Sequence, residues 1–171
     1  MTGGAADLSA PEHLTAAHDV SAFDCGEPAL NDWLKRRALP NEESGASRTY
    51  VVCAGGRVVA YYALASGGVA LAQAPGRVKR NMPDPVPVMI IGRLARDLAW
   101  KAQDLGPSLL RDAIVRTLQA AEIAGIRAIL AGAISERAKR FYETHGFKVS
   151  PADPMLLMIT VADAEKALSG N

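Results

Sequence analysis

The chain has 171 residues, which is enough for one domain with a sizeable core and short for two. Apolar residues make up 49% of the sequence and charged residues 22%, a balance that excludes an intrinsically disordered chain. A formal net charge of +1 and an aromatic content of 5% exclude a protein that is basic throughout and a surface built to stack many bases. We therefore expect a single domain over residues 1–171, with residues 1–7 frayed.

The N-terminal segment and the two cysteines indicate where in the cell the protein is expected to be. Residues 1–14 lack the positive and apolar regions of a secretory signal, and no apolar run reaches the roughly 20 residues that span a bilayer. Neither Cys25 and Cys53 nor the three histidines have metal-ligand spacing. We expect a cytoplasmic protein with reduced thiols, no membrane association and no bound metal.

The first predicted elements are a helix and a hairpin. Pro28 suits the first position of a helix in which Trp33 and Leu34 point inward. Two runs rich in β-branched and aromatic residues, within 49–65, flank a glycine pair and predict a β-hairpin. In its second strand Tyr61 and Tyr62 alternate, so we expect one to be buried and the other to line a site. Residues 66–87 are predicted to be a long irregular connection.

The central predicted unit is an apolar strand within 86–95, a polar loop, and a helix that opens at Gly106-Pro107-Ser108 and ends at a left-handed Gly125. The backbone N–H groups at such a helix start suit an anionic ligand, a diphosphate for example. A second buried strand follows, then a helix capped by Ser135 and closed by Gly146. The sequence ends with a predicted strand over 154–161 and a terminal helix or tail over 161–168. This order predicts an α/β fold, with a mixed, mostly antiparallel sheet and helices on both faces.

Two further features concern chemistry. The segment from Arg77 to Lys101 holds six basic and two acidic residues, which is either an anion-binding surface or a plain solvated one. Tyr142, in the middle of the helix after Ser135, is either a core residue or a group that projects toward a ligand at the sheet edge. The sequence contains no metalloprotease, serine-hydrolase or P-loop motif.

In combination, these segments resemble a known family. GRLARD, GPSLLRDA and AKRFYETHGF are similar to motifs A and B of the GNAT N-acetyltransferases. FDCGEPALNDWLKRRA, APGRVKRNMPDPVPV and SPADPMLLMITVADAEKAL resemble the branch formed by the toxins of bacterial type II toxin–antitoxin pairs. The resemblance covers residues 8–168. It implies an enzyme that moves acetyl from acetyl-CoA to the α-amino group of aminoacyl-tRNA and so blocks translation. It also implies a small antitoxin of ribbon-helix-helix type and a homodimer.

By the same resemblance, roles can be carried to positions in this chain. Backbone groups of Leu94, Ala95 and Arg96 would hold the acyl and pantetheine arm. Tyr142 would be the general acid, because a phenol with a pKa of about 10 is neutral at pH 7. The pyrophosphate would lie against Lys101, Ala102, Gln103, Asp104, Leu105, Gly106, Pro107 and Ser108. The residues expected to bind tRNA phosphates are Arg77, Lys79, Arg80, Lys35, Arg36 and Arg93.

The pyrophosphate loop departs from the family pattern. Ala102 and Asp104 replace two glycines that let N–H groups approach the ligand, and Arg96 replaces a small β-branched residue. A non-glycine residue at positive φ and a carboxylate near a diphosphate would each cost on the order of 1 kcal/mol or more. An ion pair between Lys101 and Asp104 is one way to offset this. Two alternatives therefore stay open, namely a GNAT acting on a small amine or a peptide N-terminus, and a weakened module with a binding role.

Overall fold

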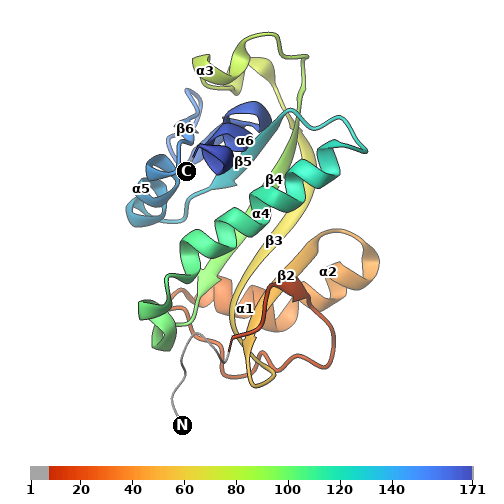
Figure 1. Cartoon of the computed structure of the whole chain (residues 1–171), viewed down its shortest axis with the longest axis vertical. Coiled ribbons are helices and arrows are strands. Elements are labelled where there is room, and N and C mark those ends of the chain that lie inside the picture. The colour runs from red at the N-terminus through yellow and green to blue at the C-terminus, as the bar shows by residue number, and fades with distance from the viewer. Residues whose placement is uncertain (1–7, 171) are drawn as a thin grey trace. The chain divides into compact units, whose positions relative to one another are not determined.

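The computed structural model describes residues 8–170, together with their side chains except those of Ala102 and Gln103. The expectation of a frayed segment at residues 1–7 lies outside the described residues. The strands, labelled in Figure 1, are β1 (Glu12–His13), β2 (Arg48–Ala54), β3 (Arg57–Val69), β4 (Val86–Arg96), β5 (Ala128–Gly132), β6 (Lys148–Val149) and β7 (Leu156–Thr160). The helices are α1 (Pro28–Arg36), α2 (Ala38–Ser44), η2 (Leu71–Gln73), α3 (Gly76–Lys79), η3 (Leu98–Gln103), α4 (Leu105–Ala121), α5 (Glu136–Thr144) and α6 (Val161–Ser169).

The strands join in one sheet in the order β1-β2-β3-β4-β5-β7-β6. β1 with β2, β2 with β3, β5 with β7 and β6 with β7 are antiparallel, whereas β4 and β5 are parallel. The chain divides into two compact units. Unit 1 comprises Met1–Ala65 and Arg93–Asp112, and unit 2 comprises Ser66–Gly92 and Ala113–Asn171. No helix within residues 8–170 has both the length and the apolar character needed to cross a bilayer.

The hairpin in unit 1 confirms the prediction made from the glycine pair. Gly55 and Gly56 have φ of 59° and 82°, the left-handed geometry of a tight two-residue hairpin turn. Contrary to expectation, Tyr61 and Tyr62 are both fully buried. The Tyr61 hydroxyl donates to the Leu30 carbonyl at 2.8 Å, and the Tyr62 hydroxyl donates to Asp112. A strand covered on both of its faces leaves neither ring free to line an open site.

Helix α1 begins at Pro28, as predicted. Leu30 and Leu34 are buried, whereas Trp33 is only partly buried and stacks on the ring of Tyr61. The sequence reading missed α2, which follows directly and ends at a left-handed Gly45. In α2 only Ala38 is buried, so the segment lacks the long apolar periodicity that reveals a helix.

The boundaries of two other segments differ from the predictions. Helix α4 begins at Leu105, one residue earlier than expected, and ends at Ala121 rather than at Gly125. Gly125 does not have left-handed φ. The helix ends in a turn that includes Ile123, whose side chain is largely exposed and so does not anchor a further helical turn on the core. The connection over residues 66–87 is more regular than predicted, since it contains the end of β3, η2 and α3. In α3 the buried Val78 anchors the short helix on the core of unit 2.

Helix α5 in unit 2 is capped at both ends as predicted. The Ser135 hydroxyl accepts from the Ala138 N–H at 3.1 Å. At the other end Phe147 N–H donates to the Tyr142 carbonyl and Gly146 N–H to the Glu143 carbonyl, each at 3.1 Å. This is the Schellman pattern, and the buried Phe147 ring packs on Tyr142.

Replacement of Gly146 by alanine is expected to destabilise the fold by about 1–2 kcal/mol. Its φ is +94°, and an added Cβ would lie 3.4 Å from Ile159 Cδ1. Gly125→Ala is the matched control, because that position has ordinary φ and open space around an added Cβ. Urea unfolding should show the loss for Gly146→Ala alone. Equal midpoints for the two variants would contradict the assigned cap.

Candidate functional site

The end of β4 forms the first part of the candidate site, in unit 1. Ala95 is buried, and Leu94 and Arg96 on either side of it are half-buried. Asp97 follows, and its N–H donates to the Val59 carbonyl at 2.7 Å. The strand therefore delivers a fixed backbone to the loop that begins at residue 98.

The predicted polar loop is a short 3-10 helix, η3. The Asp97 carboxylate caps it by accepting from the Ala99 N–H at 2.9 Å. Trp100 is buried and so anchors the segment. Lys101 is exposed, and the side chains of Ala102 and Gln103 lie outside the described residues. A cap at one end and a buried indole in the middle hold this segment in place.

Helix α4 begins directly after this loop and has no acidic residue in its first turn. The buried Leu105 pins the helix start, while Gly106 is half-buried and Pro107 and Ser108 are exposed. The first N–H groups of a helix have no partner within it, and Pro107 has no N–H to offer. Leu105 and Gly106 therefore supply the unpaired backbone donors in the first turn of α4, because the Ser108 N–H is the first to reach back to a carbonyl of the same helix, that of Asp104.

Asp104, between η3 and α4, has left-handed backbone geometry with φ 54° and ψ 36°. The positive φ considered in the sequence analysis therefore occurs at one of the two positions where the family pattern has glycine. Lys101 and Asp104 form no ion pair among the described side chains, so this way of offsetting the Asp104 charge is not observed. Both residues are exposed. This loop therefore carries a non-glycine residue with left-handed backbone geometry, and that residue adds an exposed carboxylate just before α4.

Tyr142 lies on α5 in unit 2 and is 5% exposed. Its ring packs against Phe141 and Phe147, with ring centroids 5.3 Å away in each case. Burial raises its pKa well above the ordinary value for tyrosine. Within the described residues, its hydroxyl has no hydrogen-bond partner. The ring therefore packs as a core residue does, and the hydroxyl holds its proton with no acceptor in place.

Two of the predicted basic residues lie at a cleft of about 690 Å³ in unit 2, which is also lined by Asp163 and Glu165. Arg77 and Arg80 line it, and Lys79 is exposed on the same short helix. Arg77 makes a two-point ion pair with Asp163, its Nε and Nη2 lying 3.0 and 3.1 Å from the two carboxylate oxygens. The ion pair raises the pKa of Arg77 and lowers that of Asp163. Part of the predicted basic surface is therefore already bound to a carboxylate.

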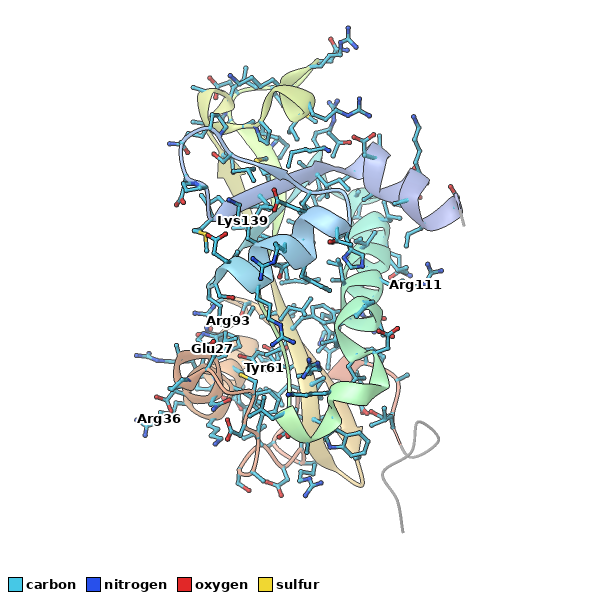
Figure 2. The ribbon with its side chains drawn as sticks, turned by 90° about the vertical axis from the view of Figure 1, so that its left-hand side faces the viewer. Glu27, Arg36, Tyr61, Arg93, Arg111 and Lys139 are labelled. Carbon is cyan, nitrogen blue, oxygen red and sulfur yellow. The ribbon has the colours of Figure 1, made fainter. Side chains whose placement is uncertain are left out.

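The other predicted basic residues lie in unit 1. Lys35 and Arg36 are exposed in the last turn of α1, and Figure 2 shows Arg36 pointing away from the ribbon. Arg93, on β4, is different, because its guanidinium lies 4.4 Å from the centre of the Trp33 ring. That contact holds Arg93 in one direction instead of leaving it as a mobile surface charge.

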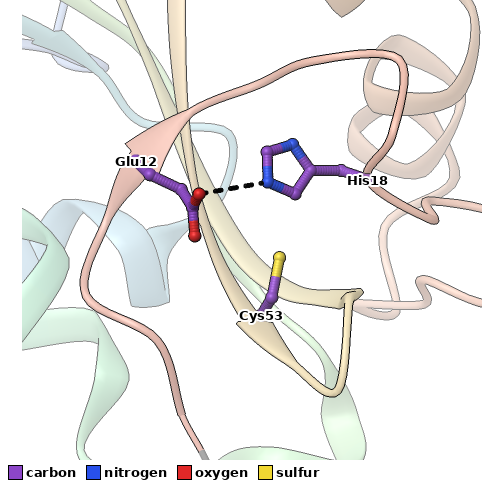
Figure 3. Close-up of side chains that lie close together, drawn as sticks. All are labelled: Glu12, His18 and Cys53. Carbon is purple, nitrogen blue, oxygen red and sulfur yellow. Dashed lines mark ion pairs between the residues drawn. The ribbon is translucent and has the colours of Figure 1, made fainter.

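One group among the described residues has metal-type donors, namely Glu12, His18 and Cys53 (Figure 3). Their ligand atoms lie within 4.8 Å of one another. His18 Nδ1 accepts the Thr15 N–H at 2.9 Å, so the neutral ring carries its proton on Nε2, 3.5 Å from Glu12 Oε1. A protonated Nε2 offers no lone pair to a metal. The geometry suits a Glu12–His18 polar contact better than a metal centre.

Comparison with known proteins identifies the family. No protein-family model matches the chain. A tRNA-acetylating toxin of Mycobacterium tuberculosis (strain ATCC 25618 / H37Rv) is 53% identical over 163 residues, which cover 95% of this chain and 98% of the relative. The chain belongs to the tRNA-acetylating toxins.

Solved structures of GNAT toxins confirm the fold of this tRNA-acetylating toxin. AtaT complexed with acetyl-methionyl-tRNAfMet is 28% identical, with a TM-score of 0.86 and coverage of 95% of this chain and 99% of that one. A tyrosine-to-phenylalanine mutant of AtaT, bound to acetyl-CoA and the C-terminus of the antitoxin AtaR, is 27% identical, with a TM-score of 0.82 and the same coverages. The predicted GNAT α/β class, the toxin branch and the acetyltransferase activity of the family are confirmed.

The sequence reading missed one basic residue of this toxin. Arg127 lines the same cleft as Arg77 and Arg80, and its Nη2 donates to the Asn81 carbonyl at 3.3 Å. It lies outside the basic segment 77–101 and stands alone before β5. The parallel pairing of β4 with β5, beside which the Arg127 N–H donates to the Pro87 carbonyl at 2.9 Å, brings Arg127 to this cleft.

Proposed function

We propose that this toxin transfers the acetyl group of acetyl-CoA to the α-amino group of an aminoacyl-tRNA and thereby blocks translation. The observation that carries this proposal is the relative named a tRNA-acetylating toxin, which is 53% identical over 95% of the chain. The similarity to AtaT with its acetylated methionyl-tRNA supports the same chemistry. An acetylated α-amino group cannot act as the nucleophile in peptide-bond formation, so the modified tRNA is lost to elongation.

The residues of unit 1 fit an acetyl-CoA ligand in most respects. The backbone of Leu94–Arg96 would hold the acyl and pantetheine arm, as the resemblance implies. The N–H groups at the start of α4 and the exposed Lys101 suit the pyrophosphate. When bound, acetyl-CoA supplies the activated thioester. The one element against the fit is the Asp104 carboxylate just before α4.

Tyr142 is proposed as the general acid. Its raised pKa keeps the phenol protonated at neutral pH, so Oη holds a proton for the departing sulfur as the C–S bond breaks. The amine nitrogen loses its own proton to water on forming the C–N bond. In this scheme Tyr142 needs no internal acceptor, and its hydroxyl has none among the described residues.

The basic residues of both units are proposed to bind tRNA phosphates. Phosphate contacts give affinity and position without reading the sequence. The proposed residues are Arg77, Lys79 and Arg80 in unit 2, and Lys35, Arg36 and Arg93 in unit 1. We add Arg127 to this proposal, because it lines the same cleft as Arg77 and Arg80.

Replacement of both Lys79 and Arg80 by alanine should raise KM for aminoacyl-tRNA roughly tenfold and reduce the salt slope of log KM by about one or two. Arg77 is left intact, because its loss would leave Asp163 without its ion-pair partner. Arg57→Ala, an exposed arginine beside the hairpin turn, is the control and should change neither value. Acetylation rates measured at several salt concentrations give both KM and its salt slope and so test phosphate binding by Lys79 and Arg80. An unchanged salt slope in the double variant would refute phosphate binding by this pair.

The proposal extends to an antitoxin, an oligomeric state and a cellular location. Because AtaT is bound by the C-terminus of its antitoxin AtaR, we propose that a small antitoxin neutralises this toxin, and by family resemblance one of ribbon-helix-helix type. The same resemblance suggests a homodimer. We also propose a cytoplasmic location, with which two free cysteines are in keeping, and one GNAT domain over residues 1–171. Light scattering of the purified toxin tests the dimer, which a monomeric mass would contradict.

The experiment for the proposed function uses purified toxin, labelled acetyl-CoA and a mixture of charged tRNAs. Label should enter the tRNA fraction, and only when the tRNA is aminoacylated. A small-amine or peptide GNAT would instead label added amines or peptide N-termini and spare tRNA. A module that only binds would label nothing.

A further inference from the structure

A polar junction joins the start of the proposed acetyl-CoA loop to the entry of helix α1 in unit 1. It consists of Asp97 on the loop side and of Asp24 and Asn31 on the helix side. Asp97 Oδ2 accepts from the Asp24 N–H at 3.0 Å, and the Leu98 N–H donates to the Asp24 carbonyl at 2.9 Å. Two bonds thus join chain segments 73 residues apart.

The helix side of the junction is held just as closely. Asp24 Oδ1 accepts from the Gly26 N–H at 2.9 Å and from Asn31 Nδ2 at 3.1 Å. Asn31 Oδ1 in turn accepts from the Cys25 N–H at 2.9 Å. These bonds fix the turn at residues 24–27 on the first residues of α1, and they lower the pKa of Asp24.

The two carboxylate oxygens of Asp97 accept hydrogen bonds from two different segments. Oδ1 caps η3 through the Ala99 N–H, while Oδ2 reaches the turn before α1. Asp97 therefore both caps η3 and connects the loop to the turn before α1 by a hydrogen bond. The helix α1 carries Trp33, which holds Arg93, as well as the exposed Lys35 and Arg36.

We propose that Asp97 is a positioning residue that, through Asp24 and Asn31, sets the acetyl-CoA loop relative to the tRNA-facing helix α1. The inference rests on the proposed function, because it takes η3 and the start of α4 as the cofactor loop. Its distinctive consequence is that a change in α1, outside the loop, weakens acetyl-CoA binding. A carboxylate that served only as a local cap would not transmit such an effect.

Three variants test this with acetyl-CoA as the calorimetric probe. Asp97→Asn keeps an oxygen for Ala99 but turns an amide donor toward the Asp24 N–H. Asn31→Asp keeps the acceptor for Cys25 but sets a carboxylate against Asp24. Asp19→Asn is the control, since Asp19 makes a similar turn contact with Ser21 in the same unit without reaching the loop.

We expect Asp97→Asn to raise the acetyl-CoA Kd roughly tenfold and Asn31→Asp to raise it severalfold, with Asp19→Asn unchanged. The double variant should weaken binding by less than the product of the single effects, because both changes break one junction. At saturating acetyl-CoA, kcat should stay within about twofold of wild type, since the reacting atoms are untouched. Circular dichroism checks the fold of each variant, and Asn31→Asp carries the test if Asp97→Asn unfolds.

Normal acetyl-CoA affinity in Asp97→Asn would overturn the inference. So would an effect of Asp97→Asn with none from Asn31→Asp, because it would reduce Asp97 to a local cap. Failure of the wild-type toxin to bind acetyl-CoA is a different result. It would overturn the proposed function itself, and this inference with it.

Discussion

Replacement of Tyr142 by phenylalanine is expected to lower kcat by a factor of about 10²–10⁴ and to leave the acetyl-CoA Kd nearly unchanged. The phenol is buried and neutral, and the substitution removes only the proposed proton source. The ring contacts with Phe141 and Phe147 survive in phenylalanine, so the fold should be retained. Single-turnover acetylation of aminoacyl-tRNA, with calorimetric titration of acetyl-CoA, separates the two quantities.

The pH profile provides a second readout. Burial raises the pKa of Tyr142, so this group should produce no fall in kcat below about pH 10, the ordinary tyrosine value. Phe141→Tyr is not a substitute donor, because that position on α5 lies one residue, about 100° of helix rotation, away. Equal losses of kcat and acetyl-CoA affinity in Tyr142→Phe would contradict the acid role and indicate a packing role instead.

Asp104 carries the second large expectation. Asp104→Asn should tighten acetyl-CoA binding severalfold at low salt, because it removes the carboxylate at the start of α4. The repulsion between that carboxylate and the pyrophosphate is expected to weaken binding by on the order of 1 kcal/mol. Asp104→Gly should tighten binding by a similar factor and also stabilise the fold by about 1 kcal/mol, since the left-handed φ of 54° no longer carries a Cβ. Calorimetry gives the affinities and urea unfolding gives the stabilities.

The two Asp104 variants separate charge from backbone strain. Asparagine keeps the Cβ and tolerates left-handed φ, so its benefit should fade as salt rises. Glycine adds a stability gain that salt does not remove. If both variants bind acetyl-CoA as wild type does, the Asp104 carboxylate lies too far from the pyrophosphate to matter, and the loop binds its ligand in another way.

Much of the architecture was predictable because local signals agreed with the fold. The glycine pair at 55–56, Pro28, Ser135 and Gly146 each have a backbone or capping requirement that few other residues meet. The helix α2 and the end of α4 were not predictable in this way. Their boundaries depend on what the rest of unit 1 or unit 2 covers, as the exposed Ile123 illustrates.

The candidate site divides in the same manner. The helix start at residue 106 and Tyr142 were singled out from the sequence pattern, and the resemblance to family motifs gave them their roles. A positive φ was considered at the two missing glycines, and it occurs at Asp104. The pairing of Arg77 with Asp163 and the arrival of Arg127 at the same cleft were not foreseen, because they join segments far apart in the sequence. The junction of Asp97 with Asp24 was invisible for the same reason. Polar contacts between residues far apart in the sequence can be predicted only once the fold is known.

The toxin is expected to acetylate the α-amino group of a charged tRNA. The most direct measurement is mass spectrometry of the aminoacyl-adenosine released by nuclease from charged tRNA after incubation with toxin and acetyl-CoA. The expected product is heavier by one acetyl group, which is located on the α-nitrogen, and much less of it should form with Tyr142→Phe. Unmodified aminoacyl-adenosine from every charged tRNA, with a folded toxin and acetyl-CoA present, would contradict it.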